Sequence, residues 1–94
     1  MVVLYVNRFK KDLKSAHKNI QGKVFEVIDK LEAADRLETS GLDCKKMEGQ
    51  KSRESYYRIR IGDWRIGLEY IHPNITLLRV LSRGEIYKSF PPKS

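Results

Sequence analysis

Apolar and polar residues alternate most regularly between Tyr56 and Tyr70, and this alternation predicts a β-hairpin. Two runs rich in β-branched and aromatic residues flank Gly62-Asp63, which places glycine at the first central position of a two-residue turn. In the register set by that turn, alternate side chains of both strands share one apolar face, with Trp64 as its largest member. The opposed apolar pairs are Ile61 with Trp64, Ile59 with Ile66, and Tyr57 with Leu68.

The opposite face of this predicted hairpin is basic. Arg60 falls directly opposite Arg65, and Arg58 falls opposite Gly67. Like charges paired across strands destabilise a sheet by a few tenths to about 1 kcal/mol, so a purely structural sheet more often pairs arginine with a carboxylate. Three guanidinium groups on one face, with Gly67 leaving room among them, indicate a site for a polyanion. A solvated basic sheet face is the alternative that stays open.

The rest of the chain predicts one strand and two helices before the hairpin and one strand after it. Val2–Val6 is apolar on both faces, which is typical of a central or covered strand. Helical spacing predicts a short helix from Asn7 with a basic outer face, then a longer helix to about Leu37. Residues 38–54 have no clear period and predict irregular structure. Residues 75–82 predict the last strand, after which the chain ends in a tail.

This order of elements predicts a compact α+β domain with a β-α-α-β-β-β topology. An antiparallel sheet is expected to pack both helices on one face and to leave the arginine face open. The 94 residues suffice for a single domain, 1–94, with a core of its own.

The composition limits which kinds of partner and which cellular compartment are expected for this protein. The chain has 19 Lys and Arg against 12 Asp and Glu, a net charge of +7, which favours nucleic acid or another polyanion as partner. Residues 45–65 hold seven basic and three acidic residues, so the excess is local. The single cysteine, Cys44, has no zinc-ligand spacing and fits a reducing cytoplasm. The apolar N-terminal stretch is too short for a signal peptide or a membrane span, so no membrane partner is expected.

Candidate chemistry rests on arginine and tyrosine. The sequence has no metal-ligand cluster, Gly-rich phosphate loop or nucleophile motif, so no metal or other cofactor is expected. Arginine stays protonated, so it can bind phosphate and stabilise the charge that develops on a phosphorane. RNA carries its own nucleophile, the 2′-hydroxyl, and its cleavage through that group needs no metal. Tyr87 is a candidate for stacking on a base or for proton transfer.

The order of elements, the run Tyr57–Ile66 and the ending Arg83–Tyr87 together resemble the RelE/ParE superfamily of type II toxins over nearly the whole chain. The resemblance implies a cytoplasmic messenger-RNA endonuclease that acts in the ribosomal A site, inhibits translation, and is held inactive by a cognate antitoxin. It implies catalytic or phosphate-binding roles for Arg58, Arg60, Arg65, Arg83 and Tyr87, with Arg65, Arg83 and Tyr87 taken as catalytic. The local charge excess adds three further candidates for binding RNA phosphates, which are Lys45, Lys46 and Lys51.

Two other functions stay open. The first is a ParE-like inhibitor of DNA gyrase that shares the fold but cleaves no RNA. Retention of Arg65, Arg83 and Tyr87 favours the nuclease, because a gyrase binder has no need of this phosphate constellation. The second is a basic RNA-binding module without catalytic activity, which exposed aromatic residues such as Tyr56 would favour.

Overall fold

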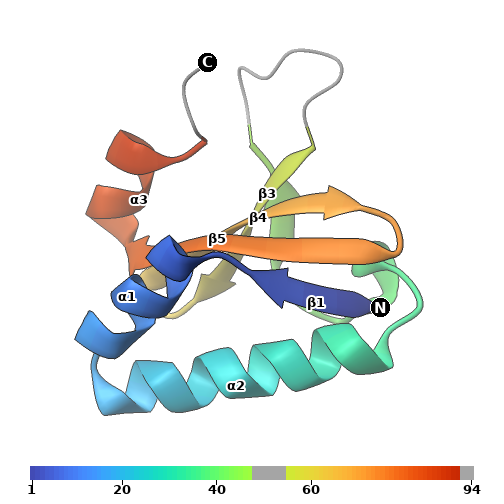
Figure 1. Ribbon diagram of the computed structural model, residues 1–94, viewed down its shortest axis with the longest axis horizontal. Helices are drawn as coiled ribbons and strands as arrows, with labels where there is room; N and C mark the ends of the chain where they lie inside the picture. The colour runs from blue at the N-terminus through green and yellow to red at the C-terminus, as the bar shows by residue number, and fades with distance from the viewer. Residues whose placement is uncertain (48–54, 92–94) are drawn as a thin grey trace.

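A five-stranded mixed sheet organises the protein, seen here in a computed structural model that describes residues 1–47 and 55–91. The strand order is β1-β5-β4-β3-β2, with α1 and α2 on one side of the sheet (Figure 1). Along the chain the elements are β1 (Val2–Tyr5), α1 (Asn7–Ser15), α2 (Lys18–Ala33), the 3-10 helix η1 (Leu37–Thr39), β2 (Cys44–Lys46), β3 (Tyr56–Ile61), β4 (Trp64–Ile71), β5 (Asn74–Ser82) and α3 (Arg83–Ser89). The predicted α+β class and the order of the first helices and the last three strands are confirmed.

The hairpin of β3 and β4 has the predicted register. Arg60 pairs with Arg65 and Arg58 pairs with Gly67, so the three guanidinium groups start from one face. Gly62 has a φ of 63°, a left-handed conformation that side-chain-bearing residues rarely adopt, which explains glycine at this turn. β5 continues the antiparallel meander beside β4, also as predicted.

The main core lies between the sheet and the first two helices. Ile59 and Ile66 of the hairpin are fully buried there, and α1 adds Phe9. Trp64 is only partly buried, because it lies at the border of this core with its ring 6.3 Å from that of His17. Trp64 is the largest residue of the predicted apolar face, but Ile59 and Ile66 are the residues of that face that are fully buried in the core. No helix within residues 1–47 and 55–91 has both the length and the apolar character needed to cross a membrane.

β1 lies at the edge of the sheet, although its apolar sequence predicted a central or covered strand. It pairs in parallel with β5, so the sheet is mixed rather than wholly antiparallel. Val3 packs against the core, whereas Val2 and Leu4 are 50% and 47% exposed. One face of β1 therefore presents apolar side chains at the surface. Although the sequence of β1 is apolar on both faces, only one face is covered by the core.

Besides the short η1, two elements were not predicted. Within the stretch expected to be irregular, β2 pairs antiparallel with β3, but its three residues are too few to display a period. The expected C-terminal tail instead begins with the seven-residue α3. α3 packs on the arginine face of the sheet, where Ile86 and Phe90 form a second apolar cluster with Met47. The arginine face is therefore partly covered, not open as expected, and this packing creates the site.

Candidate nucleic-acid interface

A groove of about 430 Å³ lies where α3 packs beside β2 and β3. Three separate segments of the chain line it: the end of β2, one residue of β3, and the C-terminal part of α3 with the residues that follow. The groove is basic on the sheet side and aromatic on the helix side. Its lining residues are Lys45, Lys46, Met47, Arg58, Tyr87, Phe90 and Pro91.

Arg58 supplies the cation at the centre of the sheet side of this groove. It lies on β3 between Lys45 of β2 and Gly67 of β4. Its Nη1 atom is buried and has no hydrogen-bond partner among the described residues. A buried donor left without an acceptor costs about 1–3 kcal/mol, more when the group is charged. An anion in the groove would supply that acceptor, so the arrangement fits phosphate binding.

Tyr87 faces the groove from α3 without being packed itself. Its side chain is 56% exposed, and its hydroxyl makes no hydrogen bond within residues 1–47 and 55–91. The helix that carries it is held at its start by the Arg83 amide, which donates to the Asp63 carbonyl at 2.8 Å. Ile86, the residue before Tyr87, is fully buried against the sheet. A tyrosine hydroxyl on a fixed helix is thus presented to whatever the groove binds.

Arg65 does not line the groove. The side chain is buried, with 7% exposure, and Nη1 donates to the carbonyls of Gly62 at 2.8 Å and Trp64 at 2.9 Å. Its Nε is also buried without a hydrogen-bond partner in the described part of the chain. Arg65 therefore braces the hairpin turn from the face that α3 covers, instead of projecting from an open face.

The other predicted site residues are placed differently. Arg60 and Arg83 are exposed and lie outside the groove lining. Lys51 lies outside the described residues. Of the eight residues predicted from the sequence, the groove therefore gathers Lys45, Lys46, Arg58 and Tyr87.

Phe90 is the functional neighbour that sequence reasoning missed. Gly67 was expected to leave room for a ligand among the arginines, but the Phe90 ring occupies that room. A Cβ placed on Gly67 would lie 2.8 Å from Cγ of Phe90. Phe90 is 3% exposed and also packs edge-on against Tyr56, with ring centroids 5.6 Å apart. A bare glycine in the middle of a strand was the available signal, because such a position often marks a close approach.

The groups with displaced pKa values lie outside the groove lining. Burial raises the pKa of the Cys44 thiol from 9.0 to about 11, and the Arg58 charge offsets this only in part. Burial also raises the pKa of Tyr57, with a further contribution from Glu38. Both residues pack against the main core on the helix side of the sheet. Both groups are protonated at neutral pH even at their ordinary pKa values, so the shifts only move their ionisation further into the alkaline range.

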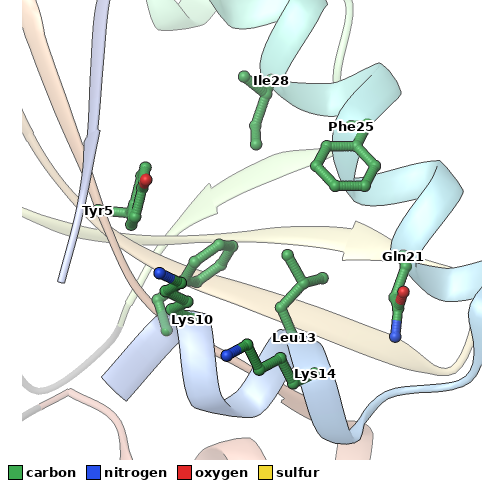
Figure 2. Close-up of a pocket in the computed structure, with 8 residues that line it drawn as sticks. Tyr5, Lys10, Leu13, Lys14, Gln21, Phe25 and Ile28 are labelled. Atoms are coloured by element: carbon green, nitrogen blue, oxygen red, sulfur yellow. The ribbon is translucent and has the colours of Figure 1, made fainter. Parts of the chain in front are cut away.

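A second cavity, of about 410 Å³, lies between α1, α2 and β1 (Figure 2). Its walls are mainly apolar and include two exposed aromatic rings, Tyr5 of β1 at 60% and Phe25 of α2 at 57% exposure. Lys10 and Lys14 of α1 lie along it (Figure 2). A basic outer face was predicted for α1, but this cavity was not predicted.

Comparison with known proteins places this chain in a family. The family described as "ParE toxin of type II toxin-antitoxin system, parDE" matches residues 3–87. The chain is 38% identical to Toxin RelE3 of Methanocaldococcus jannaschii over 91 residues, which cover 97% of this chain and 100% of the relative.

Two solved structures are also similar to this chain. A chain in the crystal structure of a RelB–RelE antitoxin–toxin complex from Methanococcus jannaschii is 36% identical with a TM-score of 0.77, covering 94% of this chain and 99% of that one. For the RelE–RelB complex from Pyrococcus horikoshii OT3 the identity is 27% and the TM-score 0.68, covering 88% and 94%. The chain therefore belongs to the ParE toxin family of type II toxin–antitoxin systems, which agrees with its resemblance to the RelE/ParE superfamily.

Proposed function

We propose that this toxin is an endoribonuclease that cleaves messenger RNA in the ribosomal A site and thereby inhibits translation. The observation that carries the proposal is the buried Nη1 of Arg58, a charged donor without an acceptor among the described residues. Arg58 lines a groove whose other cations are Lys45 and Lys46 and whose helix side holds Tyr87. The similarity to RelE toxins supports the proposal that messenger RNA and the ribosome, with its 16S RNA, are the partners of this protein.

The groove has the groups that cleavage through the 2′-hydroxyl requires. The 2′-oxygen attacks the adjacent phosphorus, the bond to the 5′-oxygen breaks, and a 2′,3′-cyclic phosphate and a 5′-hydroxyl result. Arg58 stabilises the charge on the phosphorane, while Lys45 and Lys46 hold neighbouring phosphates. The attacking hydroxyl gives its proton to water, and the leaving 5′-oxygen takes up another proton. The hydroxyl of Tyr87 is the candidate donor of that second proton, and water then reprotonates Tyr87.

Arg65 and Arg83 contribute from outside the groove lining in this proposal. Arg65 holds the carbonyls on either side of Asp63 in the hairpin, and Asp63 in turn accepts the hydrogen bond from the first amide of α3. Arg65 is therefore a positioning residue for the helix that carries Tyr87. Arg83 is exposed at the start of the same helix, where it can add a cation to a bound RNA.

The test is cleavage mapping by primer extension on programmed ribosomes with the purified protein. Cleavage should survive EDTA and leave a 2′,3′-cyclic phosphate, or its 3′-phosphate product, next to a 5′-hydroxyl. A 5′-phosphate end or loss of activity with EDTA would contradict the mechanism. Inhibition of gyrase supercoiling without RNA cleavage would favour the ParE-like alternative, and RNA binding without new ends would favour the non-catalytic module.

We also propose a cognate antitoxin as the physiological partner. The solved relatives are toxins in complexes with antitoxins, and the net charge of +7 favours an acidic segment. Such a segment is expected to cover the groove at Tyr87 or to enter the apolar cavity beside Lys10 and Lys14 (Figure 2). Co-purification of Tyr87→Ala and Phe25→Asp variants with the antitoxin separates the two surfaces. Recovery of the bare toxin from its native host would contradict the partnership.

A further inference from the structure

We propose that Gly67 and Phe90 form a positioning pair that fixes Tyr87 against the anion-binding groove. The inference deepens the proposed nuclease function and rests on it for its catalytic consequence. Neither residue bears a group that can take part in the reaction, so the pair acts only through the placement of Tyr87.

The contact is unusually close because Gly67 has no side chain. A Cβ on Gly67 would lie 2.8 Å from Cγ and 2.9 Å from both Cδ1 and Cδ2 of Phe90. Real Cβ atoms do not come under 3.0 Å from a neighbouring atom, so any larger residue forces the ring away. The nearly equal distances to three ring carbons mean that the missing Cβ would point into the face of the ring. Phe90 therefore lies flat on the backbone of β4.

This contact lies next to the phosphate-binding arginine. Gly67 is the direct cross-strand partner of Arg58. A ring seated on Gly67 therefore stands beside Arg58, and both residues line the groove. The depth to which Phe90 settles on the sheet sets how closely α3 approaches the Arg58 side chain.

Tyr87 depends on its helix for its position. It is 56% exposed, so its own packing holds it little, and it precedes Phe90 by about one helical turn. α3 is tied at its start by the 2.8 Å hydrogen bond from Arg83 to Asp63 and in the middle by buried Ile86. Phe90 on Gly67 is the third support, and it is the one on the groove side. Displacing a catalytic group by about 1 Å can cost on the order of 10²-fold in rate.

The experiment compares Gly67→Ala, Phe90→Leu and the double variant in single-turnover cleavage on programmed ribosomes. Gly67→Ala should slow the cleavage step by about 30–100-fold, while the half-saturating concentration changes less than about threefold, because Arg58 and the lysines stay in place. Phe90→Leu alone should slow it by about tenfold. In the double variant the smaller Leu side chain accepts the new methyl group, so it should cleave at least about threefold faster than Gly67→Ala.

Gly22→Ala is the matched control, because a Cβ at Gly22 meets no atom within 4 Å. It should cleave like the unchanged protein. Thermal melting of all variants ensures that cleavage is compared below their unfolding temperatures. Full activity of Gly67→Ala, effects that simply add in the double variant, or a loss confined to the half-saturating concentration would each overturn the proposal. If Gly67→Ala fails to fold, Phe90→Leu and Phe90→Ala decide by the same split between rate and affinity.

A measurement without RNA keeps this inference distinct from the nuclease proposal. A Gly67 Hα beneath the Phe90 ring should resonate upfield in the NMR spectrum, and Phe90→Leu should abolish that shift and move the Tyr87 ring signals. Unmoved Tyr87 signals would overturn the positioning role even in an active nuclease. An unchanged protein that shows these shifts but cleaves no RNA would instead overturn the proposed function.

Discussion

The carboxylate of Asp12 on α1 binds the guanidinium of Arg79 on β5, with Arg79 Nε 2.7 Å from Oδ2. The same Oδ2 accepts the backbone amide of Val80 at 3.2 Å. The contact lies where the β4–β5 pairing shifts register, between Gly67 and Leu68 on β4. The carboxylate thus joins α1 to β5 and satisfies a strand amide at an irregular point of the ladder.

We expect Asp12→Ala to lower the free energy of unfolding by about 2–4 kcal/mol. The side chains of Asp12 and Arg79 are only 9% and 16% exposed, so the substitution leaves a mostly buried cation and a strand amide unpaired. Arg8→Ala is the control, because Arg8 is 66% exposed and its Nε lies 3.9 Å from Asp12. That change should cost less than about 0.5 kcal/mol. Equal midpoints of urea unfolding for the two variants would contradict this reading.

Ile66→Ala should destabilise the protein more than Trp64→Ala does. Ile66 is fully buried at the centre of the sheet, and truncating such a residue costs about 2–5 kcal/mol. Trp64 keeps part of its surface in solvent and packs beside His17, so its truncation should cost about 1–3 kcal/mol, below the value for a fully buried ring. Guanidinium unfolding of both variants measures the order, and a larger loss for Trp64→Ala would place the main anchor at the hairpin end.

Arg58→Ala and Arg60→Ala should affect RNA binding differently. Arg58 lines the groove with an unpartnered Nη1, whereas Arg60 is exposed outside it. Losing one phosphate contact to single-stranded RNA lowers the slope of log K against log salt by about 0.7. We expect that change for Arg58→Ala and a smaller one for Arg60→Ala. Fluorescence anisotropy with a 2′-deoxy oligonucleotide, which cannot be cleaved, measures both slopes.

Cys44 should make folding stability depend on pH in the alkaline range. Burial raises the thiol pKa from 9.0 to about 11 in the folded protein. Between those values the folded chain keeps a proton that the unfolded chain has lost, so stability falls as the pH rises from about 9 to 11. Cys44→Ala should lack this component of the decline. At pH 8 the folded thiol should react with iodoacetamide about 100-fold more slowly than the unfolded one, and equal rates would contradict the shift.

Tyr87→Phe separates stacking from proton transfer. The change keeps the ring and removes the hydroxyl, so RNA affinity should hold while turnover falls by about 10²-fold or more if the hydroxyl delivers a proton. Arg83 lies outside the groove lining, so Arg83→Ala should weaken RNA binding and leave the single-turnover rate nearly unchanged, whereas a fall in that rate by about 10²–10³-fold would place its guanidinium at the transition state. A fall in affinity without a change in single-turnover rate would assign either residue to binding alone.

The sequence by itself determined the central hairpin and what each of its faces carries. Gly62 set the turn, and a period of two then fixed Ile59 opposite Ile66 and Arg58 opposite Gly67. This information is local, because a shift by one residue would move every apolar side chain to the other face. The same kind of local pattern sufficed for the first two helices and the last strand.

Only the tertiary structure decided what became of the arginine face. α3 and β2 are too short for a hydrophobic period to show in the sequence. The position of each element depends on contacts between distant segments, such as Phe90 on Gly67. That packing buried Arg65, left Arg60 in solvent, and joined Arg58 and Tyr87 in one groove. Strand pairing places the arginines on the same face of the sheet. The packing of α3 on that face then determines which of them can contact a ligand.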